Sequence, residues 1–171
     1  MSEIMSRNQK ITEDIQKHAR ELFQDGGVDV IIGYAKGTFP LNSAPIFVHN
    51  EEEVEKLSWN NFSHVNLASY LVPEIAETKG REKIPLKVGI VSKGCTARAI
   101  NILAIEEKIN LDNLKIIGIP CNGIINRRRI EQEIGEREIL DISLEGDEIV
   151  VKGHKFEERF PFEEYQNELC K

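Results

Sequence analysis

Hydrophobic and polar positions in the first fifty residues predict one helix and two strands. After a polar tail over residues 1–10, apolar residues recur at helical spacing from Ile15 to Phe23, which predicts a helix that Thr12 caps and Gly26 ends. Short apolar runs flanked by turn residues then predict two strands, over residues 28–33 and 45–49.

The middle of the chain alternates between strand-like and helical patterns. The runs LKVGIV and LKIIGI have the length and apolarity of buried strands, over residues 86–91 and 114–119. Helical spacing predicts an acidic turn over 51–57 and helices over 63–78, with a kink at Pro73, over 96–109 and over 124–134. The order strand, helix, strand, helix predicts a βαβ unit with parallel strands and a right-handed crossover. The predicted fold class is α/β, with a parallel-sheet core in three layers.

The last part of the chain changes character. Apolar runs at 139–144 and 149–152, separated by a polar turn, predict a C-terminal β-hairpin. Residues 161–169 are predicted to form a short helix with Cys170 near its end. Because no repeat or linker interrupts the sequence, we expect residues 1–171 to form a single domain.

Composition and charge narrow the function classes. The chain of 171 residues is 40% hydrophobic and 30% charged, as in a soluble globular protein, and has no apolar run of the roughly 18 to 20 residues that a membrane span needs. The polar start MSEIMSRNQK lacks the apolar middle of a signal peptide, so we expect a cytoplasmic protein. A net charge of -7 argues against a general nucleic-acid binder.

Two of the three cysteines occupy positions where ligands collect. The odd count and wide spacing argue against a disulfide framework, so the cysteines are free thiols, metal ligands or nucleophiles. Cys95 and Cys121 each follow a predicted buried strand, and ligands of parallel α/β sheets gather at the carboxyl ends of strands. If these strands are neighbours, both thiols lie on one rim and are candidate metal ligands.

The segment VSKGCTARAI has further features of a binding loop. The N-terminus of a helix lowers the pKa of a thiol and attracts anions, and Lys93 and Arg98 add positive charge on both sides of Cys95. The alternative is a small residue in a tight turn that Gly94 makes. The predicted cofactor-binding residues at this rim are Lys93, Gly94, Cys95, Thr96, Arg98, Cys121 and Gly123.

Three other positions are weaker candidates for cofactor binding. The loop YAKGT, which contains Gly37 and Thr38, loosely resembles a phosphate-binding loop, but it matches no established spacing and a plain connection is the favoured interpretation. The third position is Asn66, a predicted cofactor-binding residue at the start of a predicted helix, near His64, which is a cap or a ligand.

The run VGIVSKGCTARAINILAIEEKINLDNLKIIGIPCNG resembles the KGC and PCxG segments of the iron-sulfur beta subunits of deazaflavin-reducing hydrogenases and formate dehydrogenases. The similarity covers about residues 28–130 and implies an electron-transfer subunit with iron-sulfur and flavin partners. By the same resemblance, Cys95 and Cys121 match family cysteines, Ser63 stands where relatives carry a third, and Cys170 matches the first cysteine of a ferredoxin motif. Three cysteines are too few for a four-cysteine cluster, so a 4Fe-4S cluster or flavin is shared with a partner or is absent from this chain.

Three functions are consistent with these patterns. The first is an accessory or partial beta subunit of an iron-sulfur/flavin oxidoreductase, which transfers electrons within a complex and is not active alone. The second is a binding or assembly module that recognises an anionic ligand or partner at the KGC loop. The third, a thiol enzyme with Cys95 as nucleophile, lacks an identifiable base.

Overall fold

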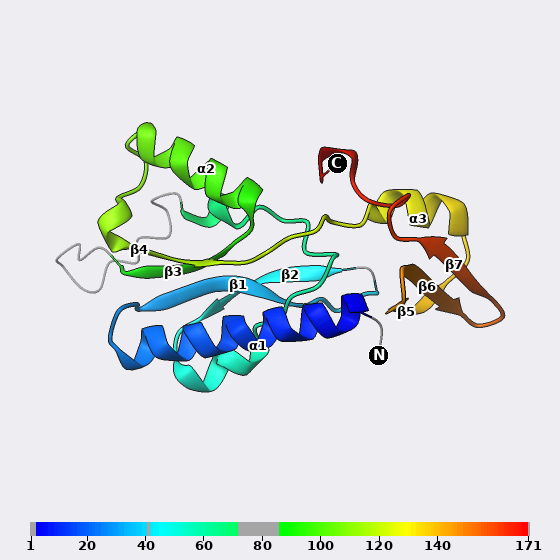
Figure 1. Cartoon of the computed structure of the whole chain (residues 1–171), viewed down its shortest axis with the longest axis horizontal. Coiled ribbons are helices and arrows are strands. Elements are labelled where there is room, and N and C mark those ends of the chain that lie inside the picture. The colour runs from blue at the N-terminus through cyan, green and yellow to red at the C-terminus, as the bar shows by residue number, and fades with distance from the viewer. Residues whose placement is uncertain (1–2, 41, 72–85, 171) are drawn as a thin grey trace.

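The fold contains two β-sheets, and the computed structural model describes residues 3–40, 42–71 and 86–170 (Figure 1). The first sheet has the order β2-β1-β3-β4. Its strands are β1 (Val30–Lys36), β2 (Ser43–Val48), β3 (Val88–Ser92) and β4 (Leu114–Gly118). Strands β1, β3 and β4 are parallel, and β2 pairs with β1 in the antiparallel direction.

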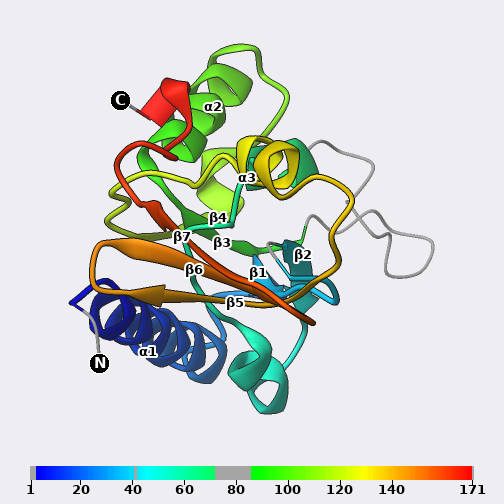
Figure 2. The ribbon, with the colours of Figure 1, turned by 90° about the vertical axis from the view of Figure 1, so that its right-hand side faces the viewer.

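Helices cover both faces of the first sheet. Helix α1 (Glu3–Gln24) lies on one face and helix α2 (Gly94–Ile105) on the other (Figures 1 and 2). Because β3 and β4 are parallel neighbours on either side of α2, the predicted βαβ unit is confirmed. The α/β class and the parallel-sheet core are therefore also confirmed. Among the described residues, no helix has the length and apolarity needed to cross a membrane.

Strand β4 is less buried than its apolar sequence predicted. It is an edge strand whose described residues pair only with β3, so side chains on one face lie at the surface. Ile116 is 50% exposed, whereas Ile117 is buried in the core between the sheet and its helices.

The N-terminal helix begins well before the predicted cap. Helix α1 already includes residues 3–10, which the sequence pattern assigned to a polar tail, because Asn8 is buried and Ile4 packs against buried residues of the C-terminal part of the chain. Thr12 is therefore an interior helical residue. Its hydroxyl donates to the carbonyl of Asn8 at 2.9 Å and accepts from the backbone N–H of Trp59 at 2.9 Å, so it ties the helix to the chain that follows β2.

The segment predicted as a long helix over 63–78 contains only a short helical turn within its described part. This turn is η2 (Leu67–Leu71), and the predicted kink at Pro73 lies outside the described residues. The backbone just before the turn is held by side chains instead of a helical ladder, since the carbonyl of Val65 accepts from the hydroxyl of Tyr34 at 2.7 Å. Other short elements are η1 (Glu51–Lys56), η4 (Leu111–Asn113) and α3 (Arg127–Ile134).

The second sheet is antiparallel and contains the predicted hairpin. Its strands, in spatial order, are β5 (Ile139–Glu145), β6 (Glu148–Gly153) and β7 (Glu157–Pro161). The turn between β5 and β6 uses Gly146 with a φ of 62°, a conformation that favours glycine. The inner face of the sheet packs on Ile130 and Ile134 of α3 in a second hydrophobic core.

The prediction of a short helix over residues 161–169 is wrong. Strand β7, which the pattern did not predict, ends at Pro161, and the chain then turns before η5 (Glu168–Cys170). The buried rings of Phe160 and Tyr165 pack at a centroid distance of 4.9 Å, and this contact holds the turn against the second sheet.

Candidate functional site

The carboxyl ends of β1, β3 and β4 meet at one rim of the first sheet, which we call the carboxyl rim. Cys95 lies in the first turn of α2, directly after β3, and Cys121 follows β4. Since β3 and β4 are neighbours, the structure places both residues on this rim, and both are exposed.

Cys170 joins the same site from the end of the chain. A β-bridge pairs Ile125 with Gln166, and the backbone N–H of Asn167 donates to the carbonyl of Ile124 at 2.7 Å. These bonds lay the last residues along the segment that follows Cys121. Cys170 is exposed and interacts electrostatically with Cys121. The sequence pattern did not assign Cys170 to this rim.

A buried lysine lies beneath the three thiols. Lys93 is only 3% exposed, its ammonium donates to the carbonyl of Ser63, and it lies 5.3 Å from the centroid of the Tyr34 ring. Burial lowers the pKa of Lys93, while negative charge on Cys95, Cys121 and Cys170 acts in the opposite direction. All three thiols are therefore close enough to Lys93 to interact with it, and their ionisation would stabilise its charged form.

The thiol of Cys121 is less acidic than an ordinary cysteine thiol. The residue as a whole is exposed, but protein atoms shield part of its thiol, and this burial raises the pKa of Cys121. The backbone N–H of Gly123 and the charge of Lys93 act against that rise without cancelling it. Gly123 itself has a φ of 110°, and a Cβ there would lie 2.8 Å from Nε2 of Gln166, so glycine is required by the turn.

Hydroxyl groups line the buried side of the carboxyl rim. Ser63 is fully buried, and its hydroxyl lies 3.1 Å from the hydroxyl of Ser43. Thr96 is fully buried beside the hydroxyl of Tyr34, but its own hydroxyl makes no hydrogen bond with a described group. Burial raises the pKa of Tyr34 above its ordinary value, which keeps the phenol neutral. The pattern had not pointed to Tyr34 or Ser43.

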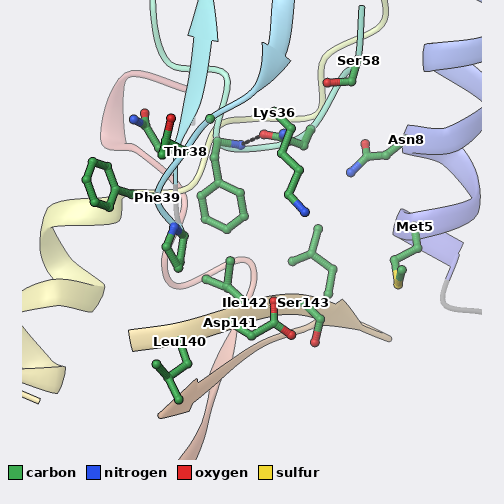
Figure 3. Close-up of a pocket in the computed structure, with 16 residues that line it drawn as sticks. Met5, Asn8, Lys36, Thr38, Phe39, Ser58, Leu140, Asp141, Ile142 and Ser143 are labelled. Atoms are coloured by element: carbon green, nitrogen blue, oxygen red, sulfur yellow. Dashed lines mark hydrogen bonds between the residues drawn. The ribbon is translucent and has the colours of Figure 1, made fainter. Parts of the chain in front are cut away.

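The other predicted residues fall into three places. Gly94 and Arg98 are exposed in the first turn of α2, next to Cys95. Gly37 and Thr38 line a separate pocket of about 500 Å³ that none of the rim cysteines lines (Figure 3). Asn66 is exposed and caps η2, since its side chain accepts from the backbone N–H of Ala68 at 3.2 Å.

The rim residues do not form a complete metal site by themselves. Within residues 3–40, 42–71 and 86–170, no group of three or more His, Cys, Asp or Glu side chains is arranged to hold a metal ion. The three thiols share their surroundings with a buried ammonium, and Ser63 offers a hydroxyl already paired with Ser43. This donor set does not fit a four-iron cluster without further ligands.

Comparison with known proteins confirms the predicted resemblance. No family model matches the chain. It is 29% identical over 100 residues to the F420-dependent formate dehydrogenase subunit beta of Methanocaldococcus jannaschii, a match that covers 58% of this chain and 24% of that protein. It is 23% identical over 153 residues to the F420-dependent formate dehydrogenase 1 subunit beta of Methanococcus maripaludis, covering 80% of this chain and 38% of the relative. The chain thus spans well under half the length of either relative.

A solved structure has a similar fold. A chain of the F420-reducing [NiFe] hydrogenase complex from Methanosarcina barkeri superposes with a TM-score of 0.64 at 13% sequence identity. The superposition covers 95% of this chain and 61% of that one. At this identity the likeness concerns the fold, which extends over both sheets of the present structure.

Proposed function

We propose that the chain is an accessory or partial beta subunit of an F420-linked oxidoreductase complex of the formate dehydrogenase or hydrogenase type. In this role it takes part in electron transfer within the complex and is not active alone. The similarity to beta subunits supports the assignment to a redox complex. The placement of Cys95 and Cys121 on one rim of the sheet, next to buried Lys93, is the observation that carries the proposal.

The exposed thiols support a site completed by another subunit. All three cysteines lie at the surface, where a docked protein can reach them, and each is a free thiol. Thiolates are the ligands that iron-sulfur clusters require, and buried Lys93 provides positive charge next to them. We therefore propose that the carboxyl rim presents the thiolates of Cys95 and Cys121 to a metal group whose remaining ligands come from a partner subunit. An iron-sulfur or flavin protein is the expected partner.

The second candidate is an assembly module without redox chemistry. One observation favours it: the buried Ser63 hydroxyl pairs with Ser43 and is already satisfied within the protein. In this case Arg98 and the backbone N–H groups at the N-terminus of α2 would recognise an anionic group of the partner, and the thiols would be dispensable.

Metal and cofactor analysis of purified complexes separates these functions. The chain is purified anaerobically, alone and together with the products of its neighbouring genes, and iron, flavin and the absorbance spectrum are measured. The proposal predicts little iron on the chain alone and iron-sulfur absorbance in the complex. A stable complex without iron would favour the assembly module, and no association and no cofactor under either condition would overturn the redox assignment.

A further inference from the structure

A pocket of about 500 Å³ lies where the two sheets approach each other (Figure 3). One wall comes from α1 and from the chain around the β1–β2 connection, and the opposite wall comes from β5. Its volume lies within the range of about 300 to 1,000 Å³ that is typical of small-molecule sites. The pocket shares no lining residue with the three cysteines or with Lys93, so a ligand bound here would be independent of the function proposed for the carboxyl rim.

The walls of the pocket are largely apolar and partly open to solvent. Phe39 is 70% exposed at its mouth, and Met5 and Leu140 are also exposed large hydrophobic residues that line it. Phe62 and Ile142 lie further inside the lining. Apolar side chains that gather around a concavity in this way mark a binding surface more often than isolated exposed residues do.

A charged amine points into this apolar space. Figure 3 shows the side chain of Lys36 extending into the pocket from the end of β1. Within the described ranges, no carboxylate forms an ion pair with Lys36, although many other lysines and arginines of the chain have such partners. Asp141 lines the wall formed by β5 and gives the pocket one negative group as well.

On the side opposite β5, two oxygen atoms of lining residues are buried behind the pocket surface and lack partners in the described part of the chain. Asn8 is only 8% exposed, and its Nδ2 donates to Oδ1 of Asn61 at 2.8 Å, but its own Oδ1 has no hydrogen bond within the described structure. The hydroxyl of Ser58, which also lines the pocket, is buried without a partner among the described residues. Neither atom has accessible surface, so a ligand in the pocket does not reach them and they take no part in the binding proposed below.

We propose that this pocket binds a small organic anion with an apolar, ring-sized body. Its carboxylate, sulfonate or phosphate would pair with the ammonium of Lys36. Its body would lie against Phe39, Phe62 and Leu140. The anionic group would pair with an ammonium that has no ion-pair partner among the described residues, and the apolar body would cover exposed apolar side chains of the lining.

Two fluorescent probes that differ only in charge test this proposal on the full chain. Anilinonaphthalene sulfonate carries an apolar ring system, an N–H and a sulfonate, whereas phenylnaphthylamine has the same rings and N–H without the charge. Titration should show both probes binding with one-to-one stoichiometry. Substituting Lys36→Met should weaken binding of the sulfonate by about tenfold, the loss expected for one charge-assisted contact, and leave the neutral probe nearly unchanged.

Two further variants exclude binding elsewhere on the surface. Lys10→Met, which removes the same charge from an exposed position on α1 outside the pocket, should leave the affinity of both probes unchanged. Ser143→Phe, on the β5 wall, fills the pocket with a ring and should abolish binding of both probes while the fold is retained by circular dichroism. The proposal would be overturned if the Lys36 and Lys10 variants lost equal affinity for the sulfonate probe. Undiminished binding of both probes to the Ser143 variant would also overturn it.

Discussion

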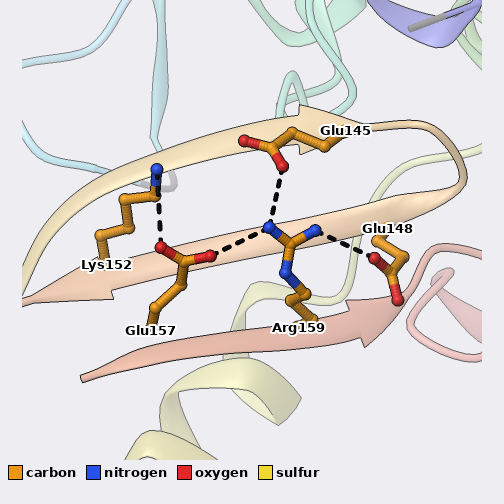
Figure 4. Close-up of polar contacts among 5 residues, drawn as sticks. All are labelled: Glu145, Glu148, Lys152, Glu157 and Arg159. Carbon is orange, nitrogen blue, oxygen red and sulfur yellow. Dashed lines mark hydrogen bonds and ion pairs between the residues drawn. The ribbon is translucent and has the colours of Figure 1, made fainter.

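Two polar regions of the molecule differ in whether their charged and polar groups are buried or exposed. They are the carboxyl rim of the first sheet and the outer face of the second. At the rim, Ser63, Lys93 and Thr96 are buried. On the outer face, which we call the ionic face, charged side chains stay at the surface and pair with one another (Figure 4). The ionic face consists of Glu145, Glu148, Lys152, Glu157 and Arg159.

The ionic face is explained by strand pairing alone. The guanidinium of Arg159 lies 3.0 Å from Glu145, 3.2 Å from Glu148 and 2.9 Å from Glu157, all on strands of one small sheet. These carboxylates raise the pKa of Arg159, and Arg159 lowers the pKa of Glu157. Because all of these groups remain in water, the pairs are screened and contribute little to stability.

The rim cannot be explained in the same way. Burying an ammonium and several hydroxyls costs free energy that folding alone does not require. The groups converge where ligands of parallel sheets bind, beside three exposed thiols. The ionic face therefore needs no explanation beyond strand pairing, whereas the buried groups of the rim are consistent with the function that we propose for it.

The largest effect on stability is expected at Tyr34. Substituting Tyr34→Phe removes the buried hydroxyl that donates to the partly buried carbonyl of Val65, and the loss of this bond should lower the free energy of urea unfolding by about 1 kcal/mol or somewhat more. Tyr70→Phe is the matched control, because Tyr70 contacts Phe47 mainly through its ring, which the substitution keeps. Equal stability of the two variants would show that the Tyr34 bond contributes nothing.

A smaller, pH-dependent effect is expected at Lys93. Because burial lowers the pKa of Lys93 in the folded state, the unfolded chain binds more protons between that pKa and the ordinary lysine value of about 10.4. Wild-type stability should therefore rise with pH across this window relative to Lys93→Met, by about 1.4 kcal/mol for each pH unit inside it. Urea unfolding from neutral pH to pH about 10 measures the difference. Parallel profiles for the two proteins would contradict a buried, destabilised ammonium.

The smallest effect is expected on the ionic face. Arg159→Gln breaks three ion pairs at once, yet the melting temperature at physiological salt should hardly change, since every partner is solvated. Any difference in melting temperature between Arg159→Gln and the wild type should disappear at acidic pH. The lowered pKa of Glu157 means that its stabilising contribution is present above the unfolded value and lost as pH falls through the folded one. A marked drop in melting temperature at neutral pH would show that this network is structurally essential.

The parts of the fold that depend on local pattern could be predicted. The run from residue 86 to 119 showed a strand, a helix and a strand, and these became β3, α2 and β4, which brought Cys95 and Cys121 to one rim. Strand β7 was not predicted because Phe160 is its one buried residue amid charged neighbours, too short a pattern to recognise.

Features that depend on distant contacts could not be predicted. Cys170 reaches the rim only because Gln166 bridges to Ile125, a pairing between segments that no local periodicity reveals. Lys93 is buried although lysines are almost always exposed, and its acceptor, the carbonyl of Ser63, lies thirty residues away. The pocket that α1 and β5 line together likewise depends on segments far apart in the sequence.

Iron content of the partner complex, compared between variants of the two regions, tests the functional assignment of the rim most directly. The double variant Cys95→Ser and Cys121→Ser is set against Arg159→Gln, each purified anaerobically with its partner subunits. We predict that iron and its visible absorbance fall to background in the rim variant and stay at the wild-type level in the ionic-face variant. Full iron content in the rim variant, with the partner still bound, would contradict a role of the rim thiols in holding a shared metal group.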